Sequence, residues 1–112
     1  MMKNGEWIMT IKKLQDLQIY DDNKMTSNIV FNEEKSKIIA FNFLPGQAMP
    51  KHGHAHKNAY VFVIEGQGQC HLDDMDYAIE PGDIIHCDPH QTISVENTGT
   101  TAMTVYVVQA EE

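Results

Sequence analysis

Three of the six histidines in this 112-residue chain stand at alternate positions, as His52, His54 and His56. In an extended strand, side chains two residues apart project from the same face. His52 and His54 would then share one space, where each offers an imidazole nitrogen to a metal ion. A solvent-exposed polar loop is the alternative interpretation of these three histidines.

The residues on either side of the histidines predict a turn and then a strand. Pro45 and Gly46 are typical of a turn, and the apolar run 60–64 predicts a strand that stops at Gly66. Turn residues such as those at 81–82 separate further short apolar runs. We expect these runs to be strands, at 29–31, 37–44, 69–73, 77–80, 83–87, 92–97 and 103–109. Turn signals at this spacing indicate an all-β sandwich or barrel.

The spacing from Gly46 through His52 and His54 resembles the first motif of the cupin family. A motif similar to the second cupin motif follows at residues 81–89, which read Pro-Gly-Asp-Ile-Ile-His-Cys-Asp-Pro. The resemblance extends over residues 38–108, in the order that the family has. It implies a double-stranded β-helix, the jelly-roll barrel of cupins.

The N-terminal residues differ from the rest of the chain. Apolar side chains at 8, 11, 14 and 17 have nearly helical spacing but no strong cap. We therefore expect an N-terminal arm or helical turn in residues 1–27 and one cupin barrel domain in residues 28–112. A chain of this length suffices for one domain with a modest core.

The resemblance also implies a metal-ligand set: two histidines and a glutamate from the first motif, and a histidine from the second. His52 and His54 match the two histidines. The glutamate position falls on Ala59, and the third histidine position falls on Ile93. Half of the set is therefore missing, and two protein ligands are fewer than zinc, iron or manganese sites normally have.

Three other histidines are candidates to complete a site with the first two. His56 continues the alternation if the strand extends that far, and lies at the barrel mouth if the chain turns at Ala55. His86 would face the site if its side of the strand is the interior one, and His90 lies in the following loop. For His71 we expect a surface or structural role.

Two functions of different classes remain open. The first is a small cupin that binds a divalent metal (Fe, Mn, Zn or Ni) through its histidines, with dioxygenase-like or isomerase-like chemistry on a small organic substrate. The second is a non-catalytic sensor or binding module for a small molecule, in which the metal site has been lost. Nucleophilic catalysis is disfavoured, because Cys70 and His71 are neighbours on a strand and point to opposite faces.

Composition restricts the partners. The net charge of −8 and the absence of arginine argue against nucleic acid and against phosphorylated ligands, although Lys37, Lys51 or Lys57 can still pair with an anion as a point charge. Two cysteines indicate buried reduced thiols, and we find neither a signal peptide nor a run long enough to span a membrane. We expect a soluble, cytoplasmic protein. Apolar residues on both faces of the strand 37–44 favour a homodimer.

Overall fold

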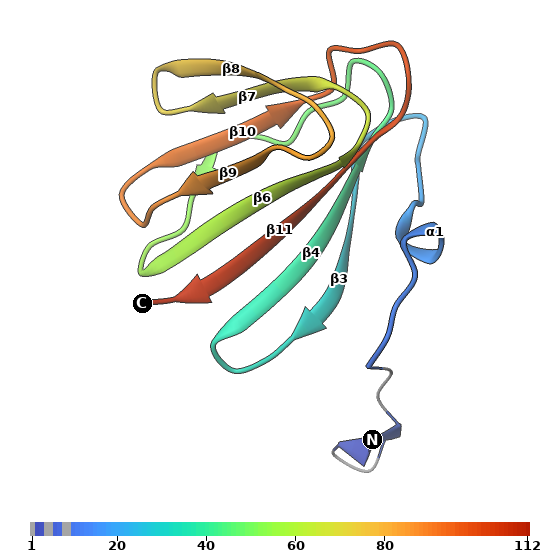
Figure 1. Cartoon of the computed structure of the whole chain (residues 1–112), viewed down its shortest axis with the longest axis vertical. Coiled ribbons are helices and arrows are strands. Elements are labelled where there is room, and N and C mark those ends of the chain that lie inside the picture. Colours follow the sequence, from blue (N-terminus) through green and yellow to red (C-terminus); the bar gives the residue numbers. More distant parts are fainter. Residues whose placement is uncertain (1, 4–5, 8–9) are drawn as a thin grey trace.

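The computed structural model describes residues 2–3, 6–7 and 10–112, and these residues are mostly in β-strands (Figure 1). The helix α1 spans only Leu14–Leu17. The strands are β1 (Met2–Lys3), β2 (Glu6–Trp7), β3 (Thr26–Asn32), β4 (Ser36–Phe43), β5 (His52–Gly53), β6 (Lys57–Glu65), β7 (Gly68–Leu72), β8 (Met75–Ile79), β9 (Ile84–Cys87), β10 (Thr92–Glu96) and β11 (Met103–Glu111). The strands expected from the sequence are therefore present, with bounds shifted by a few residues.

The strands from β3 onward form two antiparallel sheets that face each other. One sheet has the order β3-β4-β11-β6-β9, and the other has the order β5-β10-β7-β8 (Figure 1). Apart from the hairpins β3–β4 and β7–β8, consecutive strands from β4 onward lie in different sheets, as in a double-stranded β-helix. The expected all-β jelly-roll barrel is confirmed.

The inner face of the five-stranded sheet, the face toward the other sheet, carries the core. Along β6 the inward residues Ala59, Val61 and Val63 are buried, and each lies next to an inward residue of β11. The second sheet covers them with buried residues such as Cys70 and Val95. Alternation of buried and partly buried side chains therefore sets which residues can line the barrel interior.

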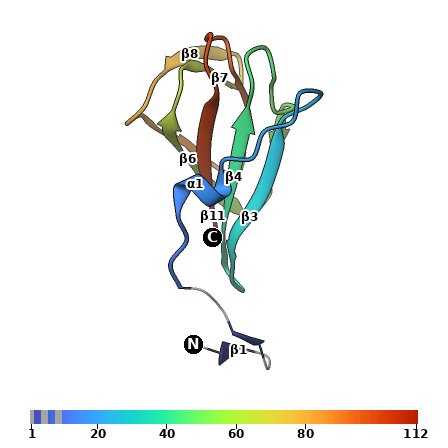
Figure 2. The same cartoon turned by 90° about the vertical axis from the view of Figure 1, so that its right-hand side faces the viewer.

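Residues 14–20, which include α1, lie against the outer face of the five-stranded sheet (Figure 2). The side-chain amide of Asn42 donates to the carbonyl oxygen of Leu17 at 2.7 Å, and the hydroxyl groups of Tyr20 and Thr104 are 3.2 Å apart. The helix is shorter than the expected lead-in, whose residues 8 and 9 lie outside the described residues. No helix in the described part of the chain is long and apolar enough to span a membrane.

Two local features concern the start of the barrel and the end of β6. β3 begins at Thr26, two residues before the predicted start of the barrel domain, and the division at residue 28 stays a prediction. β6 ends at Glu65, and Gly66 follows with a φ of +80°. A Cβ atom added at Gly66 would collide with the carbonyl oxygen of Ala102, so this turn requires glycine.

Candidate functional site

His52 points into the barrel. It lies on β5 directly opposite Ile93 of β10, and directly opposite residues of an antiparallel pair share a face. Ile93 is only 2% exposed and belongs to the core cluster. The imidazole of His52 is partly buried beside it.

His54 lies against His52. The two ring centroids are 4.6 Å apart at an interplanar angle of 76°, an edge-to-face contact. His52 Nδ1 lies 2.8 Å from the carbonyl oxygen of Pro50. That oxygen can only accept, so Nδ1 carries the proton and Nε2 of a neutral His52 presents a lone pair. The sequence prediction that these two imidazoles share one space agrees with this geometry.

The Nδ1 atom of His54 is buried without a hydrogen-bond partner. Burial, followed by the positive charges of His52 and Lys57, lowers the pKa of His54 from its ordinary value of 6.5. The imidazole of His54 is therefore neutral at neutral pH. It offers a polar atom inside the protein that no side chain or backbone group of the described chain satisfies.

His56 does not continue the alternation. The chain turns at residues 55–56, and His56 is exposed with a φ of +65°. Its carbonyl oxygen accepts a hydrogen bond of 3.0 Å from the backbone nitrogen of Glu112. His56 thus lies at the barrel mouth, which is the second of the two placements expected for it.

His86 lies on the outer face of the five-stranded sheet. On β9 the inward residues are Ile85 and Cys87, which oppose Val61 and Ala59. His86 instead stacks on Tyr60, with ring centroids 5.0 Å apart, and its Nε2 lies 2.7 Å from Oδ1 of Asn58. The strand is antiparallel to β6 as expected, but the interior face is not the one that carries His86.

His90 is exposed in the turn that joins β9 to β10. Its backbone nitrogen donates to Oδ1 of Asp88 at 2.7 Å, and its side chain has no hydrogen bond with the described part of the chain. The structure therefore brings together His52 and His54, and none of the three additional candidates joins them.

The residues at the remaining ligand positions of the family do not fit a metal ion. Ala59 is fully buried and Ile93 is 2% exposed, and both pack in the core without a donor atom in the side chain. Among the residues that the structure describes, no group of three or more His, Cys, Asp and Glu side chains is placed to hold a metal ion. Only half of the donor set is available, and the four-ligand centre does not fit this chain.

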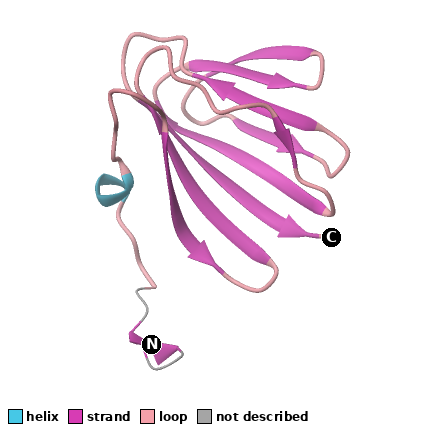
Figure 3. Ribbon diagram, turned by 180° about the vertical axis from the view of Figure 1, so that it is seen from behind, coloured by secondary structure: helices cyan, strands magenta, loops and turns pink. Residues whose placement is uncertain are grey.

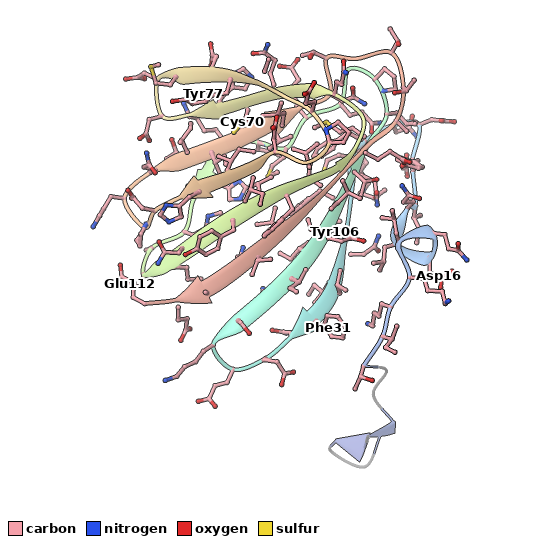
Figure 4. The ribbon with its side chains drawn as sticks, viewed as in Figure 1. Asp16, Phe31, Cys70, Tyr77, Tyr106 and Glu112 are labelled. Atoms are coloured by element: carbon pink, nitrogen blue, oxygen red, sulfur yellow. The ribbon has the colours of Figure 1, made fainter. Side chains whose placement is uncertain are left out.

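The two thiols are buried and unreactive. Burial raises the pKa of Cys70 to about 11, with a further contribution from Cys87. Burial, together with Asp88 and Asp73, also raises the pKa of Cys87. Figure 4 shows Cys70 and the neighbouring Tyr77 in the four-stranded sheet. Neither cysteine has the positive neighbourhood that stabilises a thiolate, so both belong to the core.

The sequence analysis did not single out Gln109, which is buried on the inner face of β11 at 9% exposure. The alternation of side chains along β11 could have predicted that Gln109 points inward. Val105 and Val107 are the preceding inward residues, so the same register places the amide of Gln109 inside. A polar side chain at an inward position of an apolar strand requires a partner.

Comparison with known proteins agrees with this architecture. The chain belongs to the cupin family, because the family model described as "Cupin domain" matches residues 40–109. Over 57 residues the chain is 32% identical to the oxalate-binding protein of Thermotoga maritima. That match covers 51% of this chain, and the chain spans about half the length (47%) of this curated relative.

Two solved structures have the same fold. The TT1209 protein of Thermus thermophilus superimposes with a TM-score of 0.86 at 26% identity, over 92% of this chain and 98% of that protein. An uncharacterised protein of Klebsiella pneumoniae with a double-stranded β-helix domain gives a TM-score of 0.88 at 21% identity, over 93% of this chain and 91% of that protein. The second similarity concerns the fold alone.

Proposed function

We propose that this cupin binds a small organic acid at the barrel interior, with His52 and His54 as hydrogen-bonding partners and without a four-ligand metal centre. The observation that carries the proposal is the buried Nδ1 of His54, which has no partner although it lies beside a second inward imidazole. An unsatisfied buried polar group costs about 1–3 kcal/mol, and a bound ligand atom removes that cost.

The chemistry of the pair suits such a ligand. In the tautomer that carries a proton on Nδ1, His54 donates to a carboxylate oxygen. Nε2 of neutral His52 accepts from a ligand hydroxyl group, which oxalate lacks, so oxalate tests the His54 contact alone. The relative at 32% identity is an oxalate-binding protein, which supports the choice of an organic acid. No step of this binding requires the donor atoms that Ala59 and Ile93 lack.

A divalent metal centre (Fe, Mn, Zn or Ni) with dioxygenase-like or isomerase-like activity is the second candidate. The contact between the two imidazoles and the free Nε2 of His52 favour it, because both are compatible with two ligands on one ion. It requires a third ligand from outside the pair, such as the substrate itself.

Calorimetric titration of oxalate into tag-free protein, stripped of metal with EDTA, separates the two candidates. We expect oxalate to bind the metal-free protein, and the His54→Phe variant to bind it about tenfold or more weakly, because it loses a hydrogen bond to a charged group. The matched control is His90→Phe, in an exposed turn, which should bind as the wild type does.

Two results would count against the proposal. Oxalate binding that requires added MnCl2, with stoichiometric metal by mass spectrometry, would favour the metal centre. Equal affinity of the wild type and His54→Phe for oxalate would show that His54 does not contact the ligand.

The proposal includes a homodimer. The outer face of the five-stranded sheet carries apolar side chains, and Ile84 on its edge strand is 62% exposed. Tyr60, Phe62 and Val108 lie on the same face and are partly buried. Sedimentation velocity of the wild type and of Phe62→Asp tests this: we expect a dimer that the aspartate dissociates.

A further inference from the structure

A polar hollow of about 180 Å³ lies at the open end of the barrel. The β3–β4 hairpin, the C-terminal end of β11 and the first residue of β6 enclose it, and Figure 3 shows these segments at the same end of the molecule. Its volume corresponds to roughly six water molecules in the liquid, enough for a small organic molecule. Three lysines, three glutamates and three uncharged polar residues line it: Lys35, Lys37, Lys57, Glu33, Glu34, Glu111, Asn32, Ser36 and Gln109.

Gln109 is the one buried residue among those that line the hollow. Gln109 is 91% buried (9% exposed), lies on the inner face opposite Lys37, and is one of the residues that line the hollow. Its amide makes no hydrogen bond with any described residue. A buried amide that faces an open space with both its donor and its acceptor unused is a ready-made contact for a ligand.

Two lysines flank this amide. Lys37 is the cross-strand partner of Gln109 on β4, and Lys57 begins β6 on the other side of β11. Neither ammonium group has an ion pair within 4.0 Å in the described part of the chain, although Glu111 lies directly opposite Lys57. Two unpaired cations beside an N–H donor form a favourable position for a carboxylate.

Backbone hydrogen bonds hold the walls of the hollow in place. The nitrogen of Glu111 donates to the carbonyl oxygen of Lys35, and the nitrogen of Glu112 donates to that of His56, each at 3.0 Å. The hairpin is closed by a bond of 2.8 Å from the nitrogen of Glu33 to the carbonyl oxygen of Ser36. The end of β11 is thus hydrogen-bonded both to the β3–β4 hairpin and to the turn before β6. A ligand can therefore bind with little rearrangement of the backbone.

We propose that this hollow is a second binding site, for a small hydroxycarboxylate. The carboxylate lies between Lys37 and Lys57 and accepts from the amide N–H of Gln109. The hydroxyl group donates to the carboxylate of Glu111 or to the amide oxygen of Gln109.

This site is separate from the one at His52 and His54 and does not depend on the proposed function. None of the residues that line the hollow is a histidine. Lys57 is the link between the two sites, because its positive charge also acts on His54.

Titration of L-lactate into the protein, followed by amide chemical shifts in NMR, tests the site. We expect shifts at residues 37, 57 and 109, and about tenfold or greater weakening in Lys37→Met and in Gln109→Glu, since each removes or opposes a charge-assisted contact. Gln109→Glu keeps the size of the side chain and places a negative charge in the hollow. Lys51→Met, whose ammonium group instead contacts the carbonyl oxygen of Asp73, should bind as the wild type does.

Propionate has the carboxylate without the hydroxyl group, so we expect it to bind more weakly than lactate. His54→Phe should leave lactate binding in the hollow intact, and this distinguishes the hollow from the histidine pair. Unchanged lactate affinity in both Lys37→Met and Gln109→Glu would overturn the inference, as would shifts confined to residues 52–54.

Discussion

The histidines beside the two edges of β10 lie in different environments: His52 and His54 face the barrel interior, and His71 faces outward. His52 lies opposite Ile93 and points into the barrel, where it contacts His54. His71 on β7 lies opposite the next residue, Ser94, and points to the outer face of the same sheet. A step of one residue along β10 therefore separates an interior imidazole from an exterior one.

Their partners differ as much as their positions. Nδ1 of His71 lies 2.5 Å from Oδ1 of Asp76, and Nε2 lies 3.3 Å from Oε1 of Glu96. These hydrogen bonds, the one to Asp76 first, raise the pKa of His71. His54 has no carboxylate partner, and burial lowers its pKa. The outer histidine has both ring nitrogens paired with carboxylates, whereas Nδ1 of His54 has no partner among the described residues.

The largest effect is expected when the inner pair is converted to a complete metal site. In the variant Ala59→Glu/Ile93→His, both missing ligand positions of the cupin pattern are restored next to His52 and His54. Without metal we expect the free energy of unfolding to fall by about 3–5 kcal/mol, because a carboxylate and an imidazole are placed in the core. Zinc at about a hundred times its Kd should return about 2.7 kcal/mol.

Thermal melts of this variant with and without zinc chloride measure both effects. The control is the same variant with His52→Ala, which should be destabilised in the same way and should not respond to zinc. Failure of zinc to raise the Tm of the double variant would mean that the two inner imidazoles are not oriented toward one ion.

The sequence predicted the fold and the inner pair for physical reasons. The turn residues predict where the strands begin and end, and the cupin spacing implies the jelly-roll arrangement that the structure has. The separation of two residues between His52 and His54 placed their rings together. Motif positions 59 and 93 also indicated where ligands are missing.

The placement of the other histidines could not be predicted in the same way. For His86, the sequence predicted the strand but not which of its faces is interior, because both faces carry an isoleucine. Ile84, on the same face as His86, is exposed, and Ile85, on the other face, is partly buried. For His56, the turn at residues 55–56 ends the alternation. Neither turn residue is a proline or a glycine, so the sequence does not predict the turn. The hollow at Gln109 depends on the cross-strand register, which only the folded chain reveals.

The pH dependence of stability should have opposite signs at the two environments. The lowered pKa of His54 means that its contribution is present above pH 6.5 and is lost as the pH falls below that value. The raised pKa of His71 means that its contribution is present below pH 6.5 and is lost as the pH rises through the folded-state pKa. Each effect is on the order of 1 kcal/mol or less, since the partners of His71 are largely exposed.

Urea unfolding of His54→Phe and His71→Gln at about pH 5 and about pH 8 separates the two contributions. Relative to the wild type, His54→Phe should gain stability at the lower pH, and His71→Gln should lose stability there. The same sign in both variants would contradict the contrast between the inner and outer imidazoles.

The smallest effect concerns the outer group alone. Asp76→Asn should lower the pKa of His71 toward its ordinary value, because the hydrogen bond to Asp76 is the largest cause of the rise. Glu96→Gln should lower it less, since its contact is 3.3 Å rather than 2.5 Å. We expect each stability change to be about 0.2–1 kcal/mol and to shrink with added salt, because both carboxylates are more than a third exposed. Titration of the imidazole nitrogens by NMR measures the two shifts, and a larger shift in Glu96→Gln would show that the diagonal contact to β10, rather than the direct cross-strand pair, governs this histidine.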